Sequence, residues 1–279
     1  MYDRLVKAGG AERITGPADP RVADYRDLAE PELVRSRGLF VAEGRVVVRR
    51  LIEEASYRLR SVLVNDASYR SLETTLASAG AHVPIYLCAT ADFLGITGHD
   101  LHRGCLALVE RPTPPTVDGI LDVVTSKPRA TLVVLEAVTN ADNVGAVFRN
   151  AAAFGAAAVL LSPTCCDPLY RKAIRTSMAA TLRLPFARLE RWPDGLDAMR
   201  ASGFTIVALT PRDPSIALGL LAEAPRPDRI ALLVGTEGPG LSPAAEAVAD
   251  LRVRIPIAPE VDSLNLAVAA GIALYCLRP

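Results

Sequence analysis

Three short segments in the second half of the chain place polar side chains and glycines at the edges of apolar runs. They are Asn140–Arg149, Gly235–Gly240 and Ser263–Gly271. Glycine allows a backbone to approach a ligand closely, while arginine, glutamate and asparagine side chains supply charged and polar contacts. A site of this kind needs a rigid scaffold, and the adjoining apolar runs are suited to provide one. The pattern therefore predicts a site assembled from three separate parts of one fold.

The first segment follows an expected strand, Thr131–Leu135, and leads into an expected helix, Val144–Phe154. Asn143 is the expected N-cap, because its side-chain oxygen can accept a backbone N–H at the start of that helix. Arg149 is a cation on an otherwise apolar helix, so it is either a surface residue whose stem packs on the helix or a functional group. The spacing alone leaves both residues open between a structural and a catalytic role.

The second segment is a glycine-rich loop after the expected strand Ile230–Val234. A loop at the carboxyl end of a parallel strand is where ligands bind in open α/β sheets. The glycine spacing differs from Gly-x-Gly-x-x-Gly, and no Gly-Lys-Ser/Thr follows, which disfavours dinucleotide and P-loop sites. Glu237 lies between the glycines, and a buried carboxylate requires a partner. We expect Arg149 to be that partner.

The third segment follows the expected strand Leu251–Ile255 and a loop. Ser263 is the expected N-cap of a helix over Leu264–Leu277, which puts Asn265 in the first turn, facing the site. This helix is rich in alanine and glycine, so another backbone can pack closely against it. Such a helix suits a dimer interface or an ordinary buried position.

The second half as a whole alternates short aliphatic runs with helix-like stretches, which indicates a parallel sheet covered on both faces. Its other expected strands are Ala157–Leu161 and Phe204–Leu209, and its other expected helices are Gly195–Ala201 and Pro243–Val248. The fold class is therefore α/β.

The first half predicts a smaller α/β domain. Its expected helices are Ala42–Glu54 and Tyr69–Ala79, and its expected strands are Arg60–Asn65, Val83–Leu87 and Cys105–Val109. Prolines concentrate between residues 111 and 128, and such a stretch marks a domain boundary. We expect an N-terminal domain over residues 1–110, a linker over 111–128 and a second domain over 129–279.

The composition limits which partners the protein could bind and in which compartment it could work. The chain has 279 residues with 31 Lys and Arg against 31 Asp and Glu, and this balance argues against strong non-specific binding of polyanions. Five cysteines fit neither a closed disulfide framework nor a Cys-x-x-Cys metal motif. No run approaches the ~20 apolar residues of a membrane span, and the charged N-terminus is unlike a secretory signal. The expected compartment is the cytoplasm.

In this order, the three segments resemble the signature motifs of the SpoU family of RNA ribose 2′-O-methyltransferases, within the SPOUT superfamily. Ile14–Arg21, Arg35–Gly44 and Gly98–Ala107 are similar to the opening and closing segments of the substrate-binding domain often found in that family. The resemblance implies an N-terminal L30e-like domain that binds RNA and a C-terminal parallel-sheet SPOUT domain with a deep trefoil knot. It also implies a homodimer packed through the C-terminal domain.

The resemblance implies S-adenosyl-L-methionine (AdoMet) as cosubstrate, without a metal, and assigns residues to the site. The AdoMet site would be lined by Leu209, Thr210, Gly235, Gly240, Ile255, Pro256, Leu264 and Ala269. The catalytic residues would be Asn143, Arg149, Glu237, Ser263 and Asn265. An arginine fork grips phosphate, so RNA contacts are predicted for Arg35, Arg37, Arg45 and Arg175. Ala179 stands where the family's Arg-x-Ser-x-Gly-Ala stretch usually has glycine, and this departure weakens the assignment of Arg175.

Transfer to a ribose hydroxyl requires an acceptor for its proton. The second domain contains no histidine, since the three are His82, His99 and His102, and this removes the commonest general base. Arginine is a poor base because its pKa lies above ~12. We hypothesise that Arg149 orients the ribose and stabilises the developing alkoxide, while the proton passes to an RNA phosphate.

Several interpretations of the substrate and the activity stay open. Ribosomal RNA is favoured by analogy with the N-terminal domain, and transfer RNA is the alternative. A SPOUT protein that binds RNA or assists ribosome assembly without catalysis belongs to a second class, which the intact catalytic set disfavours. A Rossmann-type nucleotide enzyme is disfavoured by the glycine spacing.

Overall fold

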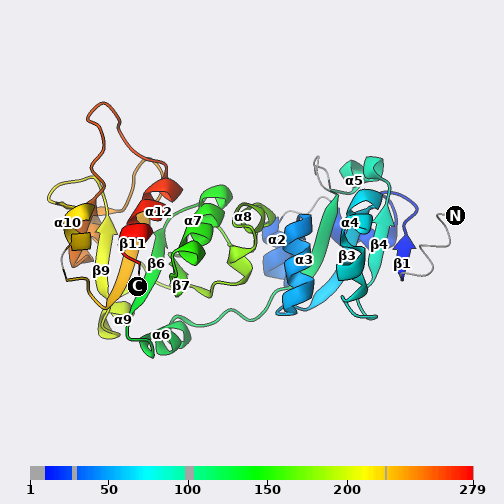
Figure 1. Ribbon diagram of the computed structural model, residues 1–279, viewed down its shortest axis with the longest axis horizontal. Helices are drawn as coiled ribbons and strands as arrows, with labels where there is room; N and C mark the ends of the chain where they lie inside the picture. The colour runs from blue at the N-terminus through cyan, green and yellow to red at the C-terminus, as the bar shows by residue number, and fades with distance from the viewer. Residues whose placement is uncertain (1–9, 27–29, 98–103, 224, 279) are drawn as a thin grey trace. The chain divides into compact units, whose positions relative to one another are not determined.

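The computed structural model describes residues 10–26, 30–97, 104–223 and 225–278. The chain divides into two compact units, and Figure 1 labels many of their elements. The first unit comprises Met1–Thr113 and Leu169–Ala179, and the second comprises Pro114–Pro168 and Ala180–Pro279. The boundary between Thr113 and Pro114 falls within the proline-bearing stretch.

The second unit contains a seven-stranded sheet in the order β10-β12-β9-β11-β6-β7-β8, and neighbouring strands pair in parallel. Its strands are β6 (Ala130–Glu136), β7 (Ala158–Leu161), β8 (Phe186–Arg188), β9 (Thr205–Leu209), β10 (Ile216–Ala217), β11 (Arg229–Gly235) and β12 (Leu251–Arg254). Every residue of β6 is buried, as is β11 from Ile230 onward. Because successive side chains point to opposite faces, both faces of the sheet centre are covered, which confirms the predicted α/β class.

The helices of the second unit are α6 (Val117–Thr125), α7 (Ala141–Ala153), α9 (Leu196–Ala201), α10 (Leu218–Glu223), α11 (Pro243–Val248) and α12 (Leu266–Cys276). α7 and α12 pack side by side (Figure 1). The Asn150 side-chain amide donates a hydrogen bond to the carbonyl of Ala267 at 2.7 Å. A Cβ at Gly271 would lie 3.0 Å from the same amide nitrogen. The small residues of α12 therefore allow α7 to approach closely.

The first unit contains a five-stranded sheet in the order β1-β4-β3-β5-β2, in which β5 is antiparallel to β3 and β2 and the other pairings are parallel. Its strands are β1 (Ala11–Arg13), β2 (Leu39–Glu43), β3 (Leu59–Asn65), β4 (Ile85–Cys88) and β5 (Cys105–Glu110). Its helices include α2 (Glu30–Ser36), α3 (Arg45–Glu54), α4 (Asp66–Ala77) and α5 (Thr90–Thr97). Among the described residues of both units, we find no helix with the length and apolar character that crossing a membrane requires.

The expected helix Ala42–Glu54 is wrong at its start. Ala42 and Glu43 belong to β2, where they pair with Ala107 and Leu106 of β5. Gly44 follows with a φ of 107°, a conformation that side chains disfavour, and α3 begins at the next residue. Periodicity missed the strand because its apolar residues run directly into those of the helix.

Helix α8 (Arg171–Thr176) belongs to the first unit, although it is distant from the rest of that unit in sequence. Glu43 of β2 accepts a hydrogen bond from Arg175 at 3.2 Å, and the Arg171 guanidinium lies 3.7 Å from the same carboxylate. The sequence predicted that this helix belongs to the second domain, because it lies within residues 129–279. Its contacts group it with the first unit instead. A short helix carries no sequence signal for which core it joins.

The cysteines are free thiols. Burial raises the pKa of the Cys88 and Cys105 thiols to about 12. Both therefore stay protonated, and a protonated thiol is a weak nucleophile and a weak metal ligand. This chemistry agrees with the absence of a cysteine motif in the sequence.

Candidate active site

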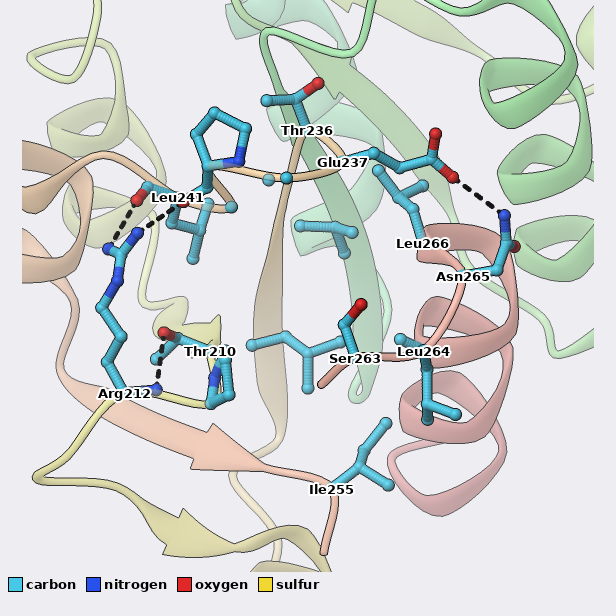
Figure 2. A pocket seen from close by; sticks show the side chains of 18 of the residues that line it. Thr210, Arg212, Thr236, Glu237, Leu241, Ile255, Ser263, Leu264, Asn265 and Leu266 are labelled. Atoms are coloured by element: carbon cyan, nitrogen blue, oxygen red, sulfur yellow. Dashed lines mark hydrogen bonds between the residues drawn. The ribbon is translucent and has the colours of Figure 1, made fainter. Parts of the chain in front are cut away.

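A cavity of about 380 Å³ lies where β9, β11 and β12 end (Figure 2). It is lined by Leu209–Arg212, Val234–Leu241, Ile255, Ile257, Asp262–Leu266 and Ala269. The carboxyl ends of neighbouring parallel strands meet at one edge of a sheet, which brings these three loops together. The volume falls within the range of about 300–1,000 Å³ typical of small-molecule sites.

The loop after β11 is shaped by its glycines. The N–H of Gly240 donates to the carbonyl of Thr236 at 3.0 Å, and this bond closes the loop. Gly238 and Gly240 have φ values of 80° and 73°, in the left-handed region that favours glycine. A Cβ on Gly235 would lie 2.2 Å from the carbonyl carbon of Gly240. The loop therefore folds back on its own start, and its backbone forms a wall of the cavity.

Asn265 links the start of α12 to the glycine-rich loop. Its Oδ1 accepts hydrogen bonds from the N–H groups of Ala267 at 3.0 Å and Val268 at 3.2 Å. Its Nδ2 donates to Oε1 of Glu237 at 2.9 Å (Figure 2). One amide side chain therefore caps a helix and holds the carboxylate of the facing loop.

Two predictions about these residues are wrong. The N-cap of α12 is Asn265 rather than Ser263. The sequence could not decide between them, since serine and asparagine are both common N-cap residues. Glu237 is exposed and bonded to Asn265, rather than buried and paired with Arg149. Sequence spacing gave no direction for the Glu237 side chain, and a loop rich in glycine carries it outward.

Thr210, Arg212 and Glu246 form a polar network that no motif indicated. Oε1 of Glu246 accepts hydrogen bonds from Thr210 Oγ1 at 2.6 Å and Arg212 Nη1 at 3.0 Å. Arg212 also donates to the carbonyls of Leu241 at 2.8 Å and Pro239 at 2.5 Å. The one available signal was an arginine three residues after the end of β9 at Leu209, and Glu246 on α11 resembled any solvated helix residue.

Helix α7 begins earlier than predicted. Asn140 is its N-cap and accepts a backbone N–H at 2.8 Å, whereas Asn143 is the third helical residue and is buried. The predicted capping role of Asn143 is therefore wrong. Arg149 lies further along the helix and is exposed. Its neighbour Asn150 bonds to the first turn of α12, the helix that starts at the cavity.

Most of the predicted AdoMet-binding residues meet at the cavity. Its lining includes Leu209, Thr210, Gly235, Gly240, Ile255, Leu264 and Ala269, together with the predicted catalytic residues Glu237, Ser263 and Asn265. Pro256, Asn143 and Arg149 lie outside the lining. Within the ranges that the structure describes, no group of three or more His, Cys, Asp or Glu side chains could hold a metal ion.

The arginines predicted to contact RNA lie in the first unit. Arg37 pairs with Asp24 at 2.6 Å, Arg45 Nε donates to Ser68 Oγ at 2.9 Å, and Arg175 bonds to Glu43. The side chain of Arg35 and residues 98–103, part of the expected closing segment of the domain, lie outside the described part. Arg37, Arg45 and Arg175 therefore each have a protein partner, which a phosphate would share or replace.

Comparison of the sequence with known proteins gives a family match. Residues 130–275 match the SpoU rRNA Methylase family. A protein of Mycobacterium bovis, named as an uncharacterised tRNA/rRNA methyltransferase, is 39% identical over 267 residues. That alignment covers 94% of this chain and 90% of the relative.

Solved structures share the fold over nearly the whole chain. The crystal structure of an AdoMet-bound rRNA methyltransferase from Sinorhizobium meliloti has a TM-score of 0.78 and 25% identity, and covers 96% of this chain and 98% of that chain. The crystal structure of an RNA 2′-O ribose methyltransferase has a TM-score of 0.77 and 27% identity, with coverages of 95% and 98%. Both alignments extend over the two units.

Proposed function

Because the chain belongs to the SpoU rRNA Methylase family, we propose that it transfers a methyl group from AdoMet to a ribose 2′-hydroxyl of structured RNA. Family membership makes it an RNA methyltransferase. The similar RNA 2′-O ribose methyltransferase structure supports the ribose oxygen as acceptor. The observation that carries the proposal is the cavity at the ends of β9, β11 and β12, where the glycine-rich loop meets the start of α12.

The cavity suits AdoMet in size and in chemical character. Apolar side chains of Leu209, Ile255 and Leu264 line it, and the glycine-rich loop offers backbone groups that no Cβ covers. A pocket that is mainly apolar with a few fixed polar groups is typical of small-molecule sites. AdoMet would supply the methyl group, and the AdoMet-bound relative of similar fold supports this cosubstrate.

Arg149 is proposed to act on the ribose. It is exposed, and its side chain makes no hydrogen bond or ion pair with any residue that the structure describes. A guanidinium offers several N–H donors in a fixed fork, so Arg149 would orient the ribose and stabilise the alkoxide as the proton passes to an RNA phosphate. Glu237, Ser263 and Asn265 would position the ribose at the cavity, and the buried Asn143 would support the helix that carries Arg149.

A second copy of this chain is the proposed partner of the α7–α12 surface. Val268, Ile272 and Tyr275 are 51%, 37% and 56% exposed, and their spacing puts them on one face of α12. Phe154 lies beside this face, with its ring 5.9 Å from that of Tyr275. Apolar side chains grouped in this way favour an interface between proteins. The homodimer would bury this face and keep the adjoining Arg149 beside bound RNA.

The proposal extends to the roles of the two parts of the chain. Residues 129–279, apart from Leu169–Ala179, would form the methyltransferase domain, with the deep trefoil knot of the SPOUT superfamily. Residues 1–110 would form an L30e-like domain that binds RNA through Arg35, Arg37, Arg45 and, from α8, Arg175. Ribosomal RNA is favoured over transfer RNA, because the family and the AdoMet-bound relative are described by rRNA. The enzyme would work in the cytoplasm, where that RNA is found.

Two experiments test the proposed function. Titration calorimetry with AdoMet should give saturable binding to the purified chain. Mapping of 2′-O-methylation across total RNA, from cells with and without the protein, should show one or a few sites that depend on it. Loss of base methylation alone, with every 2′-O-methyl site retained, would contradict the proposed acceptor.

A further inference from the structure

Arg212 fastens two walls of the cavity together. It follows β9, where its N–H donates to Thr210 Oγ1 at 3.2 Å. Its guanidinium reaches the glycine-rich loop and donates to the carbonyls of Leu241 at 2.8 Å and Pro239 at 2.5 Å (Figure 2). All three partners line the cavity: Thr210 follows β9, whereas Pro239 and Leu241 follow β11. The side chain therefore crosses from one strand-end loop to the next.

The buried carboxylate of Glu246 fixes the position of Arg212. Glu246 is only 5% exposed, and its Oε1 accepts hydrogen bonds from both Thr210 and Arg212. Its partner Thr210 is 3% exposed as well, so the Glu246 carboxylate has little access to water. A buried carboxylate needs a cation and donors to balance the loss of hydration. Arg212 meets this need with Nη1 and has Nη2 for the carbonyl of Pro239.

The glycine-rich loop is held from both sides. Arg212 binds it at Pro239 and Leu241, and Asn265 binds it at Glu237. Between these points the loop is built on glycines, which have more conformational freedom when unfolded than other residues. Bonds from Arg212 and Asn265 add to the loop's own Gly240–Thr236 hydrogen bond, and together they limit the shapes that a loop of this composition can adopt.

We propose that Arg212 is a positioning residue for the methyl donor: it holds the glycine-rich loop in the shape that receives AdoMet. This inference rests on the proposed function. Arg212 acts through Pro239 and Leu241 and does not have to touch the ligand. Without it, the loop populates open shapes, and the apparent affinity falls in proportion to the fraction that stays competent.

The test compares Arg212→Met with Arg254→Met. Arg254 has similar exposure, 41% against 44%, but bonds to Ser215 and Asp213 and not to the glycine-rich loop. We expect Arg212→Met to raise the Kd and the KM for AdoMet about tenfold, with kcat at saturating AdoMet within about twofold of wild type. Arg254→Met should leave the Kd and the KM unchanged.

Arg212→Lys separates positioning from folding, because it keeps a cation beside Glu246 but has one nitrogen in place of the fork. Its Kd for AdoMet should lie between those of wild type and Arg212→Met. Partial unfolding alone would lower kcat and the number of binding sites and leave the Kd of the folded fraction unchanged, so that result would overturn the inference. Equal affinity in all four proteins would overturn it as well. Failure of the wild-type chain to bind AdoMet would instead refute the proposed function.

Discussion

Asn265 donates a hydrogen bond from Nδ2 to Glu237 Oε1 at 2.9 Å while its Oδ1 caps α12. The same side chain therefore caps the helix and ties it to the glycine-rich loop at Glu237. Both elements line the cavity. A change at Asn265 should affect helix stability and ligand binding through different atoms, and the two effects can be separated.

Replacement of Asn265 tests this division. Asn265→Ala removes all three side-chain hydrogen bonds and should lower the free energy of unfolding by about 1 kcal/mol, the usual value of an N-cap. Asn265→Ser keeps a capping oxygen but is too short to reach Glu237, so its stability should be nearer to wild type. Both variants should bind AdoMet more weakly in calorimetry, because the loop loses its tie to α12.

Thr116→Ala is the matched control for that experiment. Thr116 caps α6 through a hydrogen bond from Gly119 N–H at 3.0 Å and does not line the cavity. It should show the same loss of stability with unchanged AdoMet affinity. Wild-type affinity in Asn265→Ser would show that the bond to Glu237 is not needed for binding.

Gly235→Ala should distort the cavity. The new Cβ would lie 2.2 Å from the Gly240 carbonyl carbon and 2.3 Å from Leu241 N. The loop must open to accept it, so we expect about 1–3 kcal/mol of lost stability, as for overpacked cores, and weak AdoMet binding. Gly219→Ala on α10 meets no atom within 4 Å and is the control. Tight AdoMet binding by Gly235→Ala would show that the loop shape is not required.

Ile272→Glu should disrupt the proposed homodimer. Ile272 lies at the centre of the exposed apolar face of α12, and a buried carboxylate there would lack a partner. Light scattering after size exclusion should give a dimer for wild type and a monomer for the variant. Val123→Glu replaces a residue of α6 that is 67% exposed, and should remain dimeric. A wild-type monomer at all concentrations would contradict this part of the account.

Simultaneous replacement of Arg35, Arg37 and Arg45 with glutamine should weaken RNA binding. Each phosphate contact that is lost should reduce the slope of log affinity against log salt by about 1. AdoMet affinity should not change, because these residues lie outside the cavity lining. Arg60→Gln, which breaks the exposed pair with Glu110, is the control in the same unit. Wild-type RNA affinity in the triple variant would assign the RNA contacts to other residues.

The sequence predicted five of the seven strands of the second unit and missed the short strands β8 and β10. It placed the starts of α9 and α11 within one residue, and it misplaced the starts of α7 and α12 by two or three residues. Apolar runs such as Ala130–Glu136 identify buried strands because both faces of the sheet are covered. Helix starts are harder, since Asn140 and Asn143 are equally good caps by type and differ only in backbone conformation. The same ambiguity led to the prediction of Ser263 as the N-cap of α12, where the structure has Asn265.

The site was predictable in its location and not in its contacts. Strand ends and glycines located the cavity, because loops after parallel strands converge at one edge of the sheet. The predicted partner of Glu237, Arg149, was wrong, because the loop geometry sets the direction of the Glu237 side chain and residue spacing does not encode that geometry. Arg212 and Glu246 were missed because their role depends on a contact across 34 residues of sequence.

We propose that this chain methylates the 2′-oxygen of RNA with the help of Arg149. The most direct measurement incubates RNA with AdoMet and protein, digests the RNA to nucleosides and quantifies 2′-O-methyl nucleosides by mass spectrometry. Wild type should form them, and Arg149→Met should form them at least about 100-fold more slowly, the usual effect of losing an oxyanion-stabilising group, with AdoMet affinity unchanged. Full 2′-O-methylation by Arg149→Met, or methylation of bases alone by wild type, would contradict the account.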